Sequence, residues 1–81
     1  MNYLVGDIGN TSTKVSILNH NFKIKKSYNI DTNKLYKKKY INRFFKKLLS
    51  KNLNKKVLFS SVAPKVCKIM KSFFKKKNFR T

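Results

Sequence analysis

Residues 3–18 read YLVGDIGNTSTKVSIL, and this stretch decides what kind of fold the chain can form. The apolar run at 3–8 ends at Gly9 and predicts a short buried strand. Residues 13–18 alternate apolar and polar side chains and predict a second strand. The GNTS segment between them is expected to form a hairpin turn, because glycine and asparagine tolerate positive φ angles. The chain therefore begins with two antiparallel strands.

The alternation continues in residues 22–30, which predict a third strand. Apolar side chains on one face are expected to be buried, while lysines and small polar residues on the other face meet water. Three consecutive strands with short turns predict an antiparallel meander. The apolar members of this strand are Phe22, Ile24, Tyr28 and Ile30.

After residue 30, the spacing of apolar residues changes from two positions to nearly four. Apolar residues recur every four positions over 34–51 and predict an amphipathic helix. The VLFSSV segment at 57–62 predicts a fourth strand, and Pro64 suits the first turn of a second helix. The apolar stripes consist of Tyr36, Tyr40, Phe44 and Leu48 in the first helix, and of Val66, Ile69, Met70, Phe73 and Phe74 in the second.

The predicted order of elements is β-β-β-α-β-α, an α/β fold. A helical crossover between strands three and four implies a mixed sheet with helices packed on it. No internal repeat or linker divides the 81 residues, so we expect one small unit over 1–81. The KKKNFRT ending carries no recognisable helix-stop signal, which hints that the unit is incomplete.

The net charge of +19 is the most extreme feature of the composition. It suggests a polyanionic partner, such as nucleic acid. However, only Arg43 and Arg80 are arginines among the 21 cations, and arginine is the residue that reads bases and phosphates with a planar fork. The sequence also contains ten asparagines, and lysine and asparagine together are typical of A-rich coding. The charge is therefore interpreted as mainly compositional, displayed on solvated faces.

Other features favour a cytoplasmic protein. The lone Cys67 cannot form an internal disulfide and offers no zinc site. No apolar run approaches the roughly 18 residues of a membrane span. The first cationic side chain is Lys14, so the basic start of a secretory signal is missing. We expect no membrane association.

The DIGNTSTK segment, residues 7–14, carries the chemistry. An ionised Asp7 in an apolar strand is costly unless a bound cation such as Mg²⁺ compensates it. Gly9 lets the backbone approach a ligand closely, and successive N–H groups in the turn can form an anion site. Thr11 and Thr13 offer hydroxyl groups, and Lys14 offers a point charge for a phosphate. The alternative is plain turn chemistry, with Asp7 capping its own loop and Lys14 as one more surface lysine.

DIGNTSTK resembles the first phosphate motif of the superfamily of acetate kinases, sugar kinases, heat-shock chaperones and actin. More narrowly, it resembles the type III pantothenate kinases. The SSVAP segment at 60–64 is similar to the Ser-Ser-Val-x-Pro segment of that family, at a fitting distance. The resemblance covers this whole chain and the N-terminal part of such a kinase. It implies a ribonuclease H-like, actin-like ATPase half-domain.

The resemblance implies ATP-dependent phosphorylation of pantothenate, a step in coenzyme A biosynthesis. It also implies Mg²⁺, a monovalent cation (K⁺ or NH₄⁺) and a homodimer. Asp7 would lie near the metal. The ATP-phosphate loop would comprise Asp7, Ile8, Gly9, Asn10, Thr11, Ser12, Thr13 and Lys14.

The catalytic aspartate, the pantothenate-binding residues and the adenosine-side motif of that family match nothing in this sequence. Asp31 precedes a polar turn and is interpreted as a solvated turn residue, so no catalytic residue is expected. Ser60 and Ser61 either line the cleft or satisfy local backbone groups at the start of the helix. Cys67 is expected to be a small core residue.

Two other hypotheses stay open beside the kinase one. The first is a small basic module that binds nucleic acid without sequence preference. The second is a decayed kinase remnant with exposed apolar edges and a tendency to aggregate.

Overall fold

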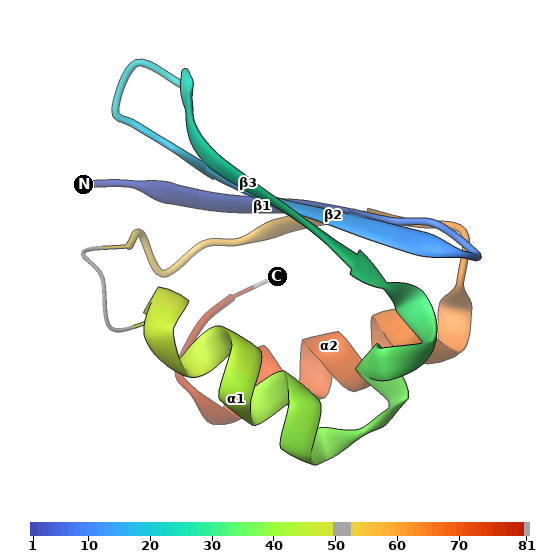
Figure 1. Ribbon diagram of the computed structural model, residues 1–81. Coiled ribbons are helices and arrows are strands. Elements are labelled where there is room, and N and C mark those ends of the chain that lie inside the picture. The colour runs from blue at the N-terminus through green and yellow to red at the C-terminus, as the bar shows by residue number, and fades with distance from the viewer. Residues whose placement is uncertain (50–52, 81) are drawn as a thin grey trace.

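The computed structural model describes residues 1–49 and 53–80. The chain forms two layers, a twisted four-stranded sheet and a layer of helices that covers one of its faces (Figure 1). The elements are β1 (Tyr3–Ile8), β2 (Ser12–Leu18), β3 (Ile24–Asp31), the 3₁₀ helix η1 (Thr32–Tyr36), α1 (Lys38–Leu49), β4 (Leu58–Ser61) and α2 (Pro64–Lys76).

The sheet has the order β3-β2-β1-β4, with β1, β2 and β3 antiparallel and β4 parallel to β1. This arrangement confirms the predicted α/β class, the antiparallel meander and the mixed sheet. The helical crossover from β3 to β4 is what allows β4 to run parallel to β1, because a parallel neighbour needs a long connection.

The hydrophobic core lies between the sheet and the helices. Alternate residues of β1 and β2 point toward the helices, and α1 and α2 each turn an apolar stripe toward the sheet. The buried apolar residues are Leu4, Ile8, Val15, Ile17, Ile30, Leu35, Ile41, Phe45, Leu48, Leu53, Val57, Val66, Met70, Phe74 and Phe79.

A glycine in β1 makes room for an aromatic ring of the core. Gly6 and Phe59 are cross-strand partners of β1 and β4. A Cβ added at Gly6 would overlap the Phe59 ring. The centroid of the Phe59 ring lies 5.4 Å from that of Phe74. Phe59 therefore links β4 to α2, and Gly6 leaves the space that its ring occupies.

The third strand is shorter than the sequence predicts. Phe22 and Ile24 were expected to be buried, but they are 66% and 61% exposed. The β2–β3 hairpin projects beyond the helix layer, so no core is available there (Figure 1). Phe22 lies in the turn with φ 63° and stacks on Tyr3 with ring centroids 5.0 Å apart. The irregular pairing at Ile17 and Leu18 also shifts the register at this end.

The first helix is divided, whereas the sequence predicts one helix over 34–51. Its first part belongs to η1, where Asp31 accepts a hydrogen bond from the N–H of Asn33 and caps the turn. Lys37 is extended and separates η1 from α1. Tyr36 is 49% exposed and does not join the core. The predicted helix end at 50–51 lies outside the described residues.

The second helix ends at a recognisable signal, so the expectation of no helix-stop signal was wrong. Asn78 adopts a left-handed conformation with φ 65°. Its N–H donates to the Lys75 carbonyl (3.1 Å), and the Phe79 N–H donates to the Phe74 carbonyl (2.9 Å). This is the hydrogen-bond pattern of a Schellman motif, with asparagine in place of the usual glycine. The hydrophobic contact that usually accompanies this motif is made by Phe74 and Phe79, whose ring centroids lie 5.9 Å apart.

Candidate functional site

Three segments that are distant in the sequence meet at one end of the sheet. They are the β1–β2 turn, the start of η1 and the link from β4 to α2 (Figure 1). The Thr32 N–H donates to the Thr11 carbonyl (3.0 Å), and the Val62 N–H donates to the Ile8 carbonyl (3.0 Å). The turn is therefore held by backbone hydrogen bonds on both of its sides.

The turn closes through a hydrogen bond of 3.0 Å from the Gly9 N–H to the Ser12 carbonyl. The expectation that positive φ angles shape this turn was wrong, because among the described residues such angles occur at Phe22 and Asn78. Glycine is required at position 9 for a different reason. An added Cβ would lie 2.8 Å from the Ser12 carbonyl oxygen, which is too close.

Asp7 lies on the open face of the sheet, opposite to the helices. Its neighbours in the chain, Gly6 and Ile8, belong to the covered face, whereas the Asp7 side chain is exposed. The premise that its carboxylate sits in apolar surroundings was therefore wrong, because an apolar run in a strand still presents alternate residues to two different faces. Solvent can stabilise the charge of Asp7 without a bound metal.

The cross-strand partners of Asp7 form a polar row on this face. Lys14 of β2 is its partner on one side, and Ser60 of β4 is its partner on the other. The Ser60 hydroxyl donates a hydrogen bond of 2.9 Å to the Asp7 carboxylate. Asn29 of β3, the partner of Lys14, extends the row. An acid, a hydroxyl, a cation and an amide are thus aligned across four strands.

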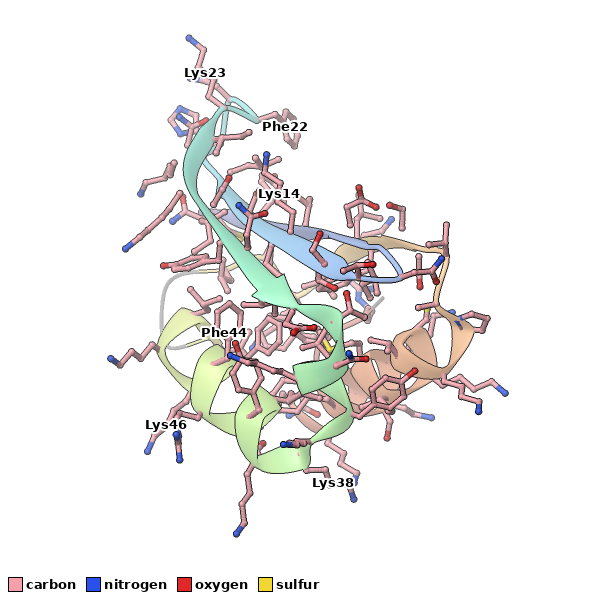
Figure 2. The ribbon with its side chains drawn as sticks, turned by 45° about the vertical axis from the view of Figure 1, so that its right-hand side comes forward. Lys14, Phe22, Lys23, Lys38, Phe44 and Lys46 are labelled. Carbon is pink, nitrogen blue, oxygen red and sulfur yellow. The ribbon has the colours of Figure 1, made fainter. Side chains whose placement is uncertain are left out.

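Lys14 carries the positive charge of this row. It lies on the exposed side of β2, on the opposite side of the sheet from the helices (Figure 2). Although Lys14 and Asp7 are register partners, no ion pair joins these two described residues. The ammonium group is therefore available to an anion that approaches the open face beside the turn.

Two members of the predicted phosphate loop point away from this face. Ile8 is fully buried in the core, and the Thr13 hydroxyl lies in the covered layer, 2.8 Å from the Thr32 hydroxyl. Thr32 in turn donates to the Gly9 carbonyl (2.9 Å). The side chains of Ile8 and Thr13 thus support the loop from beneath. The exposed members are Asp7, Asn10, Thr11, Ser12 and Lys14.

Thr32 and Ser60 have roles that sequence reasoning did not find or left open. Thr32 braces the turn, and no local pattern identifies it, because its partners Gly9 and Thr13 lie far away in the chain. The structure also divides the serine pair. Ser60 faces Asp7, whereas Ser61 bonds locally, accepting from the Ala63 N–H and donating to the Ala63 carbonyl (3.0 Å each).

The donor set at this end fits a metal ion that is bound mainly by its phosphate ligand. Within residues 1–49 and 53–80 no group of three or more His, Cys, Asp or Glu residues lies together. Asp7 offers a single exposed carboxylate. Mg²⁺ commonly takes one or two carboxylates and completes its shell with water and phosphate oxygens. Asp31 instead caps η1, in agreement with its interpretation as a turn residue.

The expectation that Cys67 is a core residue was wrong. Cys67 is half-buried on α2 and is one of the residues around a cavity of about 180 Å³ beside β4. In the described part of the chain, no helix is both long enough and apolar enough to cross a membrane.

The mixed four-stranded sheet and its helix layer form an α/β fold that is compatible with a half-domain of the ribonuclease H-like, actin-like type. The sequence profile of the type III pantothenate kinase family matches residues 3–80, so the chain belongs to this family. Membership in a kinase family implies use of ATP. A search among curated proteins found no match.

Proposed function

We propose that residues 7–14 form the ATP-phosphate-binding loop of a pantothenate kinase. The observation that carries this proposal is the row of Lys14, Asp7 and Ser60 on the open face, directly beside a turn braced from beneath by Thr32. Positioned groups on rigid strands favour phosphoryl transfer, which depends mainly on orientation and charge stabilisation.

Each exposed group in the row has a distinct role. Lys14 supplies a point charge for the terminal phosphates, and the Thr11 and Ser12 hydroxyls donate hydrogen bonds to phosphate oxygens. Asp7 holds a Mg²⁺ ion, with Ser60 fixing the carboxylate through its hydrogen bond. When bound, Mg²⁺ neutralises charge on the phosphate oxygens.

We propose that the complete kinase transfers a phosphoryl group from ATP to pantothenate in coenzyme A biosynthesis. We propose that these 81 residues form the N-terminal part of the kinase domain and do not catalyse this transfer alone. Asp7 is assigned to the metal and Asp31 caps a turn, which leaves neither acid to act as a general base for the acceptor hydroxyl.

Two further properties are carried over from the family resemblance, a monovalent cation (K⁺ or NH₄⁺) and a homodimer in the presence of the residues that complete the kinase. The proposed cytoplasmic location follows instead from the lone cysteine and from the lack of a basic secretory start in the sequence.

Backbone-amide NMR at moderate salt tests the loop. Addition of Mg-ATP is expected to shift the signals of Gly9 to Lys14 selectively. The variant Asp7→Asn should weaken this response, whereas Asp31→Asn, which removes the same charge from a capping residue, should leave it intact. Equal, diffuse shifts over all lysine-bearing surfaces would contradict the proposal.

A non-specific nucleic-acid module is the second candidate function, motivated by the net charge of +19. Lysines are exposed on the β2–β3 hairpin and on both helices. Such a module would bind DNA with a steep salt dependence, because released counterions scale with the phosphates contacted. Such DNA binding, without a selective shift of the Gly9 to Lys14 amide signals on addition of Mg-ATP, would favour the nucleic-acid function over ATP binding.

The decayed-remnant hypothesis predicts exposed apolar surface, and β4 has some. Leu58 and Val62 are 60% and 66% exposed near the open edge of the sheet. The same surface is expected if further residues of a kinase domain pack there. Size-exclusion chromatography at increasing concentration distinguishes the two, because a remnant should aggregate and also fail to respond to Mg-ATP.

A further inference from the structure

A groove runs between α1 and α2 on the side of the helix layer that faces away from the sheet. It contains two neighbouring cavities of about 450 Å³ and 510 Å³, which share the lining residues Asn42, Phe73 and Lys77. The lining residues on α1 extend from Lys38 to Leu49. At 1.5 Å per residue, this stretch of helix is roughly 16 Å long.

The groove exists because the two helices meet through a few large rings. The ring of Phe45 lies 5.6 Å from the ring of Phe73 and 5.3 Å from that of Phe74. Phe45 and Phe74 are buried beneath the groove, and Phe73 is half-buried at its floor. Beside these rings the helices separate and leave an opening.

The floor of the groove is apolar and its rim is cationic. Ile69 and Phe73 of α2 and Leu49 of α1 are half-buried and contribute apolar surface, and the buried Ile41 lies beneath them. Figure 2 shows Lys38 and Lys46 pointing outward from the two ends of α1. The rim lysines are Lys38 and Lys46 on α1, Lys68 and Lys76 on α2, and Lys77 just beyond it.

An acidic amphipathic helix matches all three properties of the groove. Its apolar stripe would pack on the floor, in the way that amphipathic helices generally occupy hydrophobic grooves. Glutamates or aspartates beside that stripe would meet lysines on both sides. Three turns of such a helix correspond to the length of the groove.

Other occupants fit less well. A second copy of this chain would bring another +19 charge toward the same lysines, which is repulsive. Nucleic acid would satisfy the lysines but would leave the apolar floor without a partner, since its outer surface is a phosphate backbone.

We propose that the α1–α2 groove is a docking site for an acidic amphipathic helix of a partner protein. The site lies on the opposite side of the molecule from the phosphate loop, so it is independent of the proposed kinase function. The helix would lie along the groove with its apolar residues toward Phe73 and its carboxylates toward the lysine rim.

The test uses three synthetic peptides of about 18 residues with a fluorescent label. The first is a helical peptide with leucines at i, i+3, i+4 and i+7 and glutamates flanking them. The second replaces its glutamates by glutamines, and the third scrambles the order at constant composition. Binding is measured by fluorescence anisotropy at about 0.15 M salt, because this salt concentration screens charge interactions beyond roughly 8 Å. We expect the first peptide to bind about tenfold more tightly than the other two.

Variants then locate the binding site. Lys68→Glu combined with Lys76→Glu is expected to weaken binding of the first peptide about tenfold. Lys23→Glu combined with Lys25→Glu changes the charge equally on the β2–β3 hairpin and should have little effect. The variant Ser72→Trp narrows the groove at an exposed position without changing the charge, and should abolish binding.

Several results would overturn the proposal. Equal loss from both pairs of lysine variants would show that the net charge attracts the peptide wherever lysines lie. Equal binding of the scrambled peptide would remove the requirement for a helix. Tighter binding of phosphatidylserine vesicles or duplex DNA, sensitive to Ser72→Trp while the peptide is not, would assign the groove to a membrane or to nucleic acid. A far-UV circular dichroism spectrum and a thermal unfolding midpoint like those of the unaltered chain would show that each variant is folded.

Discussion

Ser60 and Asp7 are 53 residues apart in the sequence, yet the Ser60 hydroxyl donates a hydrogen bond of 2.9 Å to the Asp7 carboxylate. The contact forms because β4 lies parallel to β1 and places the two residues side by side on the open face of the sheet. It joins the two sequence motifs, DIGNTSTK and SSVAP, into one surface. The consequence is that Ser60, which contacts no ligand in our proposal, positions the residue assigned to the metal.

Ser60→Ala is therefore expected to weaken Mg-ATP binding about fivefold, because Asp7 loses a hydrogen bond of roughly 1 kcal/mol that orients its carboxylate. NMR titration of the Gly9 to Lys14 amides measures the effect. Ser27→Ala is the matched control, since Ser27 is an exposed serine of the same sheet with a comparable hydrogen bond to Ser16 (2.9 Å). An equal effect of both substitutions would mean that Ser60 has no special relation to the loop.

The buried Thr13–Thr32 pair gives an asymmetric prediction. Because the Thr32 hydroxyl donates to the Gly9 carbonyl, the Thr13 hydroxyl must donate to Thr32. Thr13→Val removes one donor and is expected to lower the free energy of unfolding by about 1 kcal/mol. Thr32→Val leaves both the Thr13 hydroxyl and the Gly9 carbonyl without this partner, and is expected to cost about 2–4 kcal/mol.

Urea unfolding of the two threonine variants measures these costs. Valine keeps the shape of threonine, so the comparison isolates the hydroxyl groups. A larger loss from Thr13→Val than from Thr32→Val would contradict the proposed direction of the two hydrogen bonds.

Gly6→Ala is expected to destabilise the protein by about 1–3 kcal/mol, because the added methyl group overlaps the Phe59 ring and forces the core to rearrange. Thermal unfolding followed by circular dichroism measures the loss. The loss of stability caused by Gly6→Ala should be smaller when Phe59→Leu is already present than in the unaltered chain, because the leucine side chain leaves room for the added methyl group. Strict additivity of the two substitutions would show that the overlap is not the cause.

Asn78 offers a test of the helix-stop motif. Asn78→Gly should maintain or raise stability, because glycine adopts the left-handed conformation without strain. Asn78→Val should lower it by about 1–2 kcal/mol, the cost of that conformation for a branched residue. Both changes are measured by thermal unfolding. If valine and glycine proved equivalent, the motif would contribute nothing to the end of α2.

Much of the fold could be predicted from the order of hydrophobic patterns. The strand at 3–8, the switch to a helical period and the role of Pro64 depend on local geometry, which neighbouring residues determine. The failures have local causes that patterns do not reveal. Phe22 follows the alternation of a strand, but the hairpin extends past the helices and no core reaches it.

The proposed phosphate loop shows the same division. The sequence suggested its candidate residues, because an acid, a glycine turn, hydroxyls and a lysine form a compact chemical pattern. Asp7 was expected in apolar surroundings, because the order of residues in a strand does not by itself show which face of the sheet is covered. The register with Lys14 and Ser60 shows that Asp7 faces solvent.

The sequence by itself determined the class of fold and the order of the elements, because strand and helix periods and turn chemistry act over a few neighbouring residues. Only the tertiary structure decided that Thr32 braces the turn, that Ser60 faces Asp7 and that lysines of α1 and α2 surround an apolar groove. These relationships join residues far apart in the chain. They arise from strand pairing and helix packing, which bury apolar surface collectively and so depend on the whole chain at once.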